Sequence, residues 1–203
     1  MEKIIEIFTL LTGVIYVILE IRQKNLMWVL GIFTSLASMW MFYHNGMYAS
    51  FGLQIYYFVT AFIGLWQWRR DRGDLAVEQQ KQDSSICLRR LPLRTAFVSV
   101  LLIVAGSFVL SWAMDRLHAL GMLAENPMSL LDASIATISM VATWWLVRSY
   151  LQQWWLWIVA NVLTIALCCI GQMWWMAALY VAYMAASVIG LRYWRKNGVY
   201  LES

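Results

Sequence analysis

Charged residues are scarce in this sequence. Only 13% of the 203 residues are Asp, Glu, Lys or Arg, and 62% are apolar, whereas soluble domains average about 25% charged and roughly 45–50% apolar residues. This composition argues against a water-soluble enzyme. Charged residues are absent from three stretches, 25–68, 95–114 and 149–191. Because one bilayer crossing takes about 20 mostly apolar residues, each long stretch has room for two transmembrane helices and the short one for a single helix.

Cysteine and histidine are also few, which argues against several kinds of site. The sequence has three cysteines, Cys87, Cys168 and Cys169. Because their number is odd and their spacing does not match a metal site, we expect neither a disulfide framework nor a metal site. His44 and His118 fall near predicted outer loops, so the sequence lacks the buried pair expected of a haem-binding membrane protein. No arrangement of residues suggests a catalytic triad. We therefore predict no catalytic residues, no metal and no cofactor.

Long apolar segments are abundant, and they predict the fold. They lack the period-two alternation of a membrane-spanning barrel, which leaves helices as the structure that pairs every backbone group in lipid. We predict an all-α integral membrane protein with seven transmembrane helices, near residues 4–21, 26–43, 50–68, 95–114, 131–147, 153–170 and 174–194.

The predicted helices group as three, one and three. The first three form a bundle over residues 1–68, and a cytoplasmic loop follows over 69–94. A connector helix and an outer loop occupy 95–130, and a second three-helix bundle with a short cytoplasmic tail occupies 131–203. No small-residue cleavage site accompanies the first apolar stretch, so we expect the first helix to remain in the mature protein.

The positions of Lys and Arg predict the orientation. With the N-terminus outside, thirteen of the 15 Lys and Arg residues fall on the cytoplasmic side, against Lys3 and Arg116 outside. An excess of these residues marks cytoplasmic loops, so we predict an outer N-terminus and a cytoplasmic C-terminus. The net charge of +4 then reflects topology. We expect no nucleic-acid partner, because no basic stretch is combined with a soluble aromatic face.

The first and last three helices match each other without gaps at an offset of 126 residues. The matched pairs include Glu6 with Asp132, Arg22 with Arg148, Trp28 with Trp154, and Tyr57 with Tyr183. Charged residues are rare in membrane spans, so acid over acid and arginine over arginine favour duplication over a chance likeness of apolar sequences. Parallel repeats of this kind place a substrate site at their shared interface.

One face of the helix predicted at 153–170 carries aromatic and polar side chains. Trp154, Trp157 and Asn161 are spaced i, i+3 and i+7 and share that face. An indole attracts a cation or stacks on a heteroaromatic ring, and an Asn within a span needs a polar partner. We predict that Trp157 and Asn161 bind a ligand. Trp154 either joins them or belongs, with Trp155, to the tryptophans of the membrane interface.

Other helices supply candidates that complete this site. Gln54 and Tyr57 share a face of the helix at 50–68, and the repeat places Tyr183 at the position of Tyr57. Thr34 and Ser35 lie on the helix face of the first bundle that is equivalent, by the repeat, to the face with Trp157 and Asn161 in the second bundle. A Gln or a hydroxyl within a span needs a polar partner, which makes these residues ligand candidates.

Two acids near the outer ends of the spans have two possible roles. Glu6 and Asp132 occupy equivalent positions in the first helix of each bundle. Ionisable residues within the membrane are functional candidates. Their placement equally suits stabilisation of a helix N-terminus by a carboxylate.

The three-one-three layout, the parallel repeat and the pattern Trp154-x-x-Trp157-x-x-x-Asn161 together resemble the PnuC family of bacterial vitamin transporters. The resemblance extends from Glu6 to Lys196. It implies a full-length fold like that of the SWEET proteins, a homotrimer, and a location in the bacterial inner membrane. It further implies uptake of a B vitamin by facilitated diffusion, without a coupling ion, followed by trapping through a cytoplasmic vitamin kinase.

The same resemblance assigns Trp154, Trp157 and Asn161 to the substrate pocket, with Gln54 and Tyr57 on the opposing wall. Nicotinamide riboside and thiamine are both flat, cationic heteroaromatic molecules, and a tryptophan-lined cage suits either. We expect nicotinamide riboside, with thiamine as the alternative because helix 26–43 lacks the amide expected of nicotinamide riboside carriers. Phosphorylated forms should be poor substrates, since the helix face with Trp154, Trp157 and Asn161 has no Arg or Lys to bind a phosphate. The rival from another class is a membrane-embedded enzyme or a sensory subunit.

Overall fold

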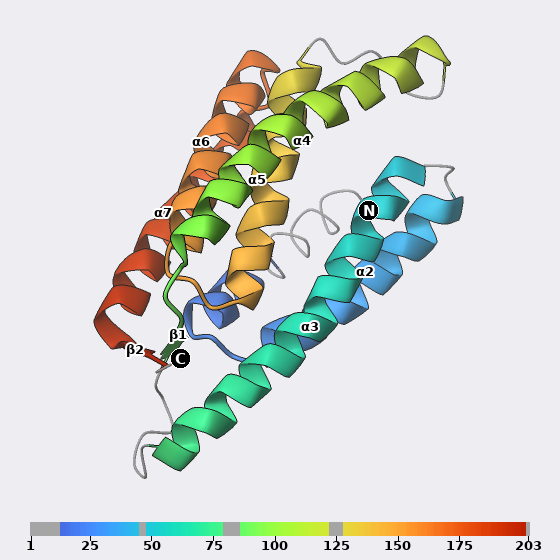
Figure 1. The fold of residues 1–203 in the computed structure, drawn as a ribbon. Helices are drawn as coiled ribbons and strands as arrows, with labels where there is room; N and C mark the ends of the chain where they lie inside the picture. Colours follow the sequence, from blue (N-terminus) through green and yellow to red (C-terminus); the bar gives the residue numbers. More distant parts are fainter. Residues whose placement is uncertain (1–12, 45–47, 79–85, 122–127, 202–203) are drawn as a thin grey trace. The chain divides into compact units, whose positions relative to one another are not determined.

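The computed structural model describes residues 13–44, 48–78, 86–121 and 128–201, and it shows an all-α membrane protein (Figure 1). Residues 13–21 are helical. The further elements are α2 (Leu26–His44), α3 (Tyr48–Glu78), β1 (Ile86–Leu88), α4 (Leu93–Ala119), α5 (Ser129–Val147), α6 (Gln153–Ile170), α7 (Trp174–Asn197) and β2 (Gly198–Tyr200).

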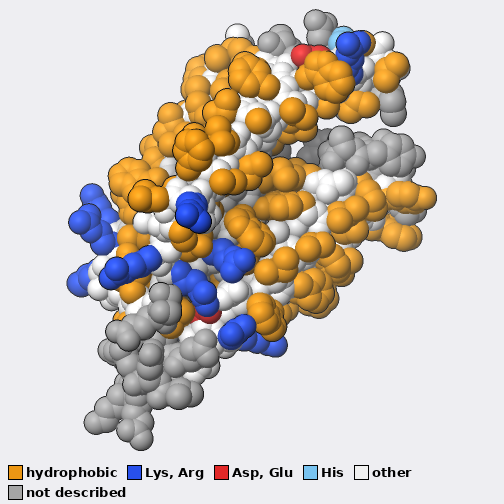
Figure 2. Space-filling model, in the orientation of Figure 1, with side chains coloured by type: hydrophobic (Ala, Val, Ile, Leu, Met, Phe, Trp, Pro, Cys, Tyr) orange, Lys and Arg blue, Asp and Glu red, His pale blue; other side chains and the backbone are white. Residues whose placement is uncertain are grey.

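Four of the described helices are long and apolar enough to cross a bilayer. These are α4, α5, α6 and α7, and α2 contains a shorter apolar segment, Leu26–Trp40. Hydrophobic side chains cover most of the helix surface that Figure 2 shows. On α4 the large exposed side chains include Phe97, Phe108 and Trp112. A surface of this kind suits contact with lipid chains.

The segment predicted as the 69–94 loop is more ordered than its polarity suggests. Helix α3 continues to Glu78, past the predicted end at residue 68. Strand β1 then pairs in parallel with β2, so that Ile86 lies opposite Gly198 and Leu88 opposite Tyr200. Helix α4 likewise continues to Ala119, beyond the predicted end at residue 114. Charge ends a membrane span, but it does not end a helix, because Arg, Lys and Glu favour helices in water.

The described chain divides into two compact units. The first contains residues 1–89, 146–151 and 192–203, and the second contains 90–145 and 152–191. In the first unit α2 lies against α3, and Trp28 occupies the space beside Gly64. A Cβ atom at Gly64 would lie 2.5 Å from Cε2 of Trp28, so this helix contact depends on a residue without a side chain.

Buried tryptophans also fix the ends of helices in the first unit. The Trp68 indole Nε1 donates a hydrogen bond to the carbonyl of Leu146 at 3.2 Å. The Trp194 indole Nε1 donates to the carbonyl of Ile21 at 2.9 Å. The two rings lie 6.5 Å apart, centroid to centroid. Both bonds satisfy carbonyls at helix C-termini, which lack partners within their own helix.

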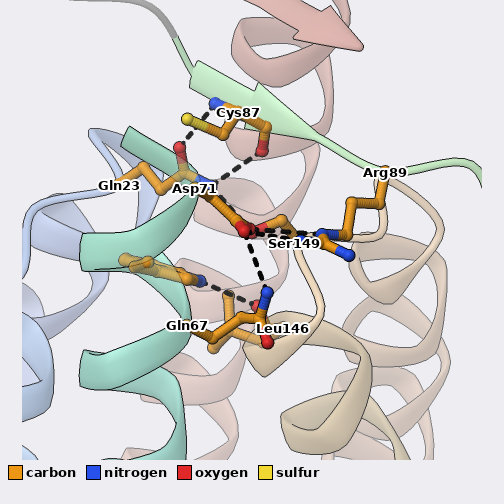
Figure 3. Close-up of polar contacts among 8 residues, drawn as sticks. Gln23, Gln67, Asp71, Cys87, Arg89, Leu146 and Ser149 are labelled. Atoms are coloured by element: carbon orange, nitrogen blue, oxygen red, sulfur yellow. Dashed lines mark hydrogen bonds and ion pairs between the residues drawn. The ribbon is translucent and has the colours of Figure 1, made fainter. Parts of the chain in front are cut away.

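A buried polar network lies beside these tryptophans (Figure 3). We call it the Gln23 network, and its members are Gln23, Gln67, Asp71, Cys87, Arg89 and Ser149. The Gln23 side chain donates to the Cys87 carbonyl at 3.0 Å and to Ser149 Oγ at 3.2 Å, and it accepts from the Cys87 amide at 2.8 Å. It therefore ties β1 to the turn that follows α5.

The fully buried Asp71 is the acidic member of this network. Its Oδ1 accepts hydrogen bonds from Gln67 Nε2 at 2.9 Å and from Arg89 at 2.6 Å. Arg89 also forms an ion pair with this carboxylate. A buried carboxylate requires such compensation, since an unpaired charge in the interior is costly.

In the second unit, hydroxyl groups connect α4 to α5. Ser107 Oγ and Thr137 Oγ1 are 2.8 Å apart, Ser111 Oγ and Ser129 Oγ are 2.9 Å apart, and the Trp145 indole Nε1 donates to Ser99 Oγ at 3.0 Å. Small polar residues of this type allow close helix approach and provide hydrogen bonds where lipid offers none.

Candidate substrate-binding site

Helix α6 has a polar buried face and an apolar exposed face. Its buried residues are Gln153, Trp154, Ala160, Asn161, Thr164 and Cys168. Its exposed side chains include Trp155, Val159 and Val162. This distribution is the reverse of that on a helix at the surface of a soluble protein. The polar side chains of α6 therefore face protein.

Trp154 fills a helix contact inside the second unit. Its side chain is 1% exposed, and a Cβ atom at Gly190 on α7 would lie 2.5 Å from its Cζ2 atom. The contact has the same form as that of Trp28 with Gly64. Trp154 thus packs α6 against α7, whereas its neighbour Trp155 is 59% exposed and has the position expected of an interfacial tryptophan.

Trp157 and Asn161 lie on the buried side of α6 with incompletely used polar groups. Trp157 is half-buried, and its indole N–H is buried without a hydrogen-bond partner among the described residues. Asn161 donates from Nδ2 to Ser187 Oγ at 3.3 Å, and Ser187 Oγ donates to the Tyr183 carbonyl at 2.9 Å. The structure thereby connects two residues of the predicted site, Asn161 on α6 and Tyr183 on α7, through the hydroxyl of Ser187.

Aromatic rings accompany this cluster on α7. Tyr183 is half-buried, and its ring meets that of Tyr180 edge to face at 5.8 Å. The half-buried Trp157 and the buried Asn161 on α6, and the tyrosine pair on α7, supply aromatic faces and a carboxamide, which are groups that can contact a flat cation and hydrogen-bond its substituents.

The remaining candidates lie in the first unit. Gln54 and Tyr57 on α3 are both half-buried, and the Tyr57 ring lies 5.5 Å from that of Tyr56. Thr34 is on an exposed face of α2, and its hydroxyl donates to the carbonyls of its own helix at Leu30 and Gly31. The buried hydroxyl of α2 belongs to Ser35, which occupies the position equivalent to Asn161.

Of the two acids predicted from the sequence, the structure describes only Asp132. Glu6 lies outside the described residues. Asp132 is half-buried in the first turn of α5, where a carboxylate stabilises the positive end of the helix dipole. Its position is therefore suited to a helix-stabilising role. Within the described ranges, no group of three His, Cys, Asp or Glu residues is placed to hold a metal ion.

Sequence reasoning missed one polar residue of this helix face. Gln153, the first residue of α6, is fully buried. Neither its Oε1 nor its Nε2 has a hydrogen-bond partner in the described part of the chain. Its spacing of i, i+4 from Trp157 was visible in the sequence, but Gln153 is the first residue of the predicted helix 153–170, at the boundary of the membrane span.

These helices and their inward polar groups define a multi-pass α-helical membrane protein. The chain belongs to the family described as nicotinamide mononucleotide transporter, whose model matches residues 3–196. It is 27% identical over 197 residues to the nicotinamide riboside transporter PnuC of Neisseria mucosa, an alignment that covers 91% of this chain and 69% of that one. It is 22% identical over 168 residues to the protein of the same name from Escherichia coli, covering 75% and 69%.

A solved structure has the same fold. The crystal structure of the vitamin B3 transporter PnuC matches 92% of this chain and 78% of its own, with a TM-score of 0.62 and 23% sequence identity. The resemblance to the PnuC family and the all-α membrane fold are thereby confirmed.

Proposed function

We propose that this chain takes up nicotinamide riboside across the bacterial inner membrane. Its family and the names of its relatives from Neisseria mucosa and Escherichia coli support this role. The observation that carries the proposal is the Asn161–Ser187 hydrogen bond, which fixes a buried carboxamide on α6 one helical turn from the half-buried Trp157.

The chemistry of Trp157 and Asn161 suits nicotinamide riboside better than its phosphate. The pyridinium ring of nicotinamide riboside is flat and cationic, and an indole face attracts such a ring. Helix α6 contains neither Lys nor Arg, so it has no cation to compensate a phosphate group. We therefore favour the riboside over the mononucleotide that the family description names.

The transport cycle that we propose rests on the repeat. Six of the seven transmembrane helices form two like-oriented triplets and the fourth connects them, and the triplets rock to expose the substrate alternately to each side. Three pairs of positions at the offset of 126 support this: Trp28 with Trp154, Gly64 with Gly190, and Gln23 with Ser149, the last with positive φ angles of 49° and 56°. Transport is uncoupled, the chain forms a homotrimer, and a cytoplasmic kinase retains the vitamin.

Thiamine is the second candidate, and a specific position favours it. Ser35 stands on α2 at the equivalent of Asn161, and its hydroxyl donates to the Gly31 carbonyl at 2.7 Å. The first triplet thus offers no carboxamide there to pair with the carboxamide of nicotinamide. Thiamine, which has a cationic ring without that substituent, does not need one.

Binding and uptake by the purified protein test the proposal. Calorimetric titration with nicotinamide riboside, thiamine, riboflavin and nicotinamide mononucleotide should give saturable binding of the first alone. Vesicles containing the protein should take up radiolabelled nicotinamide riboside, and protein-free vesicles should not. Saturable binding of thiamine alone would move the assignment to the second candidate. Binding of none of the four would favour the membrane-embedded enzyme or sensory subunit.

A further inference from the structure

Gln153 is a buried amide whose two polar groups have no hydrogen-bond partner among the described residues. Its side chain is 0% exposed, and both Oε1 and Nε2 are buried without hydrogen bonds to the described residues. Buried polar groups are normally satisfied, and leaving both groups of one amide unpaired costs free energy. An amide in this condition needs a partner beyond the described residues, and a bound polar ligand is one that would satisfy both of its groups.

The internal repeat supplies a comparison for this position. The residue 126 positions earlier is Met27, which is also 0% exposed. Methionine and glutamine have similar length and volume, so packing at this place in the fold does not require an amide. The second triplet therefore carries hydrogen-bonding capacity that the first triplet lacks.

The position of Gln153 on α6 relates it to the proposed site. Gln153, Trp157 and Asn161 follow each other at four-residue spacing, which brings them to neighbouring positions on one side of the helix. Each step rises about 6 Å along the axis. The Trp157 indole is thus flanked by two amides, Asn161 on one side and Gln153 on the other.

The unpaired indole N–H of Trp157 alone would be weak evidence. Trp28 in the first triplet also has a buried Nε1 without a partner among the described residues. An amide differs, because it presents one donor group and one acceptor group together. That combination matches a carboxamide or a pair of sugar hydroxyls, and it does not match an apolar ligand or an isolated charge.

We infer that Gln153 hydrogen-bonds the substrate on the side of Trp157 opposite to Asn161, and that it determines specificity for a neutral polar substituent of a cationic nucleoside. This inference rests on the proposed function. In the conformation described, solvent does not reach the amide, so the substrate reaches it when the neighbouring side chains move apart. A bound substrate would give this amide hydrogen-bond partners, which favours the bound conformation.

The variant Gln153→Met tests this inference, since methionine is the residue at the equivalent position. Full-length protein in detergent is titrated with nicotinamide riboside by calorimetry, and its thermal unfolding is measured in the absence of ligand. We expect the unfolding temperature to be unchanged or higher and the affinity for nicotinamide riboside to fall at least tenfold. Trp155→Ala is the control. It changes an exposed side chain two residues after Gln153, and it should keep wild-type affinity.

Two further ligands identify the substituent that Gln153 contacts. If it contacts the carboxamide, the difference between Gln153→Met and wild type should disappear with the pyridinium riboside that lacks the carboxamide. If it contacts the ribose, the difference should persist with that riboside and disappear with nicotinamide. Either pattern is a change in selectivity, which a purely structural residue would not produce.

Several outcomes would overturn the inference. Unchanged affinity and selectivity in Gln153→Met would show that only water, or nothing, meets this amide. Unfolding of both Gln153→Met and Gln153→Leu would show that the amide is structural. Failure of the wild-type protein to bind nicotinamide riboside would instead contradict the proposed function, so the two failures are distinguishable.

Discussion

Neighbouring residues of α6 show how a single helical step decides the role of a tryptophan. Trp154 is buried against Gly190, while Trp155 is exposed. Successive residues of a helix are rotated by about 100°, so adjacent side chains face different surroundings. Trp157 returns to the buried side and keeps an unpaired indole N–H. Of these three indoles, Trp157 is the one that we expect to contact the substrate.

The variant Trp157→Ala tests this expectation. Loss of an indole that contacts a desolvated cation should cost about 2 kcal/mol, so we expect the affinity for nicotinamide riboside to fall by more than tenfold. Calorimetry is the measurement, because it does not depend on tryptophan fluorescence. Trp155→Ala should bind normally, and equal losses in the two variants would contradict the assignment of faces.

The candidate residues on α6 and those on α2 differ in how well the sequence predicts them. Trp157 and Asn161 follow from spacing alone, because an aromatic and an amide on one face of an apolar helix are conspicuous. Thr34 and Ser35 are adjacent hydroxyls on α2, and sequence does not reveal which of them is buried. The structure places Ser35 inside and Thr34 outside, since the rotation of α2 is set by its packing against α3.

At the scale of elements, a large indole beside a glycine sets the contact in each triplet. Trp28 meets Gly64 between α2 and α3, and Trp154 meets Gly190 between α6 and α7. The sequence contained both pairs at the offset of 126, but it gave no sign that the partners touch. Each contact joins residues more than thirty positions apart, so it depends on tertiary packing.

Gly190→Ala should therefore destabilise the fold. A methyl group there would lie 2.5 Å from Trp154 Cζ2, and overpacking of this kind costs typically about 1–3 kcal/mol. Gly52→Ala on α3 is the matched control, because nothing lies within 4 Å of its Cβ position. Thermal unfolding in detergent should show a lower midpoint for the first variant alone. An unchanged midpoint for Gly190→Ala would mean that α6 and α7 separate readily.

The Gln23 network predicts a second effect on stability. Arg89→Ala removes the ion-pair partner of the fully buried Asp71, and breaking a buried pair costs about 3–5 kcal/mol. Because Arg89 itself is partly exposed, we expect the lower end of that range. Adding Asp71→Asn to Arg89→Ala should restore part of the loss, since it removes the uncompensated charge. The exposed Arg195→Ala is the control, and thermal unfolding is again the measurement.

The strands and the length of α3 were beyond the reach of sequence reasoning. β1 and β2 have three residues each and pair across more than one hundred residues, so their formation depends on tertiary contacts. The charged residues after Trp68 correctly marked the end of an apolar segment, but helix α3 continues through them. Hydropathy reports where lipid ends, and backbone hydrogen bonding decides where a helix ends.

At the scale of the whole molecule, the placement of positive charge predicts which side faces the cytoplasm. In a variant without the three native cysteines, Leu120→Cys should react with an impermeant thiol reagent added to intact cells. Asn197→Cys should react only after the cells are permeabilised. Both positions are exposed, so access through the membrane decides the result. The opposite pattern would reverse the predicted orientation, because it would place thirteen Lys and Arg residues outside.

Uncoupled transport makes the final concentration inside vesicles a direct test of mechanism. A carrier that only rocks around a neutral site does no work, so with the membrane potential held at zero the cation nicotinamide riboside should enter until the inner and outer concentrations are equal. Imposed proton or sodium gradients should leave that end point unchanged. A nicotinamide riboside kinase with ATP inside the vesicles should raise total accumulation, because α6 has no Lys or Arg to carry the phosphorylated product back. Accumulation above equality without the kinase would show that an ion gradient drives the cycle.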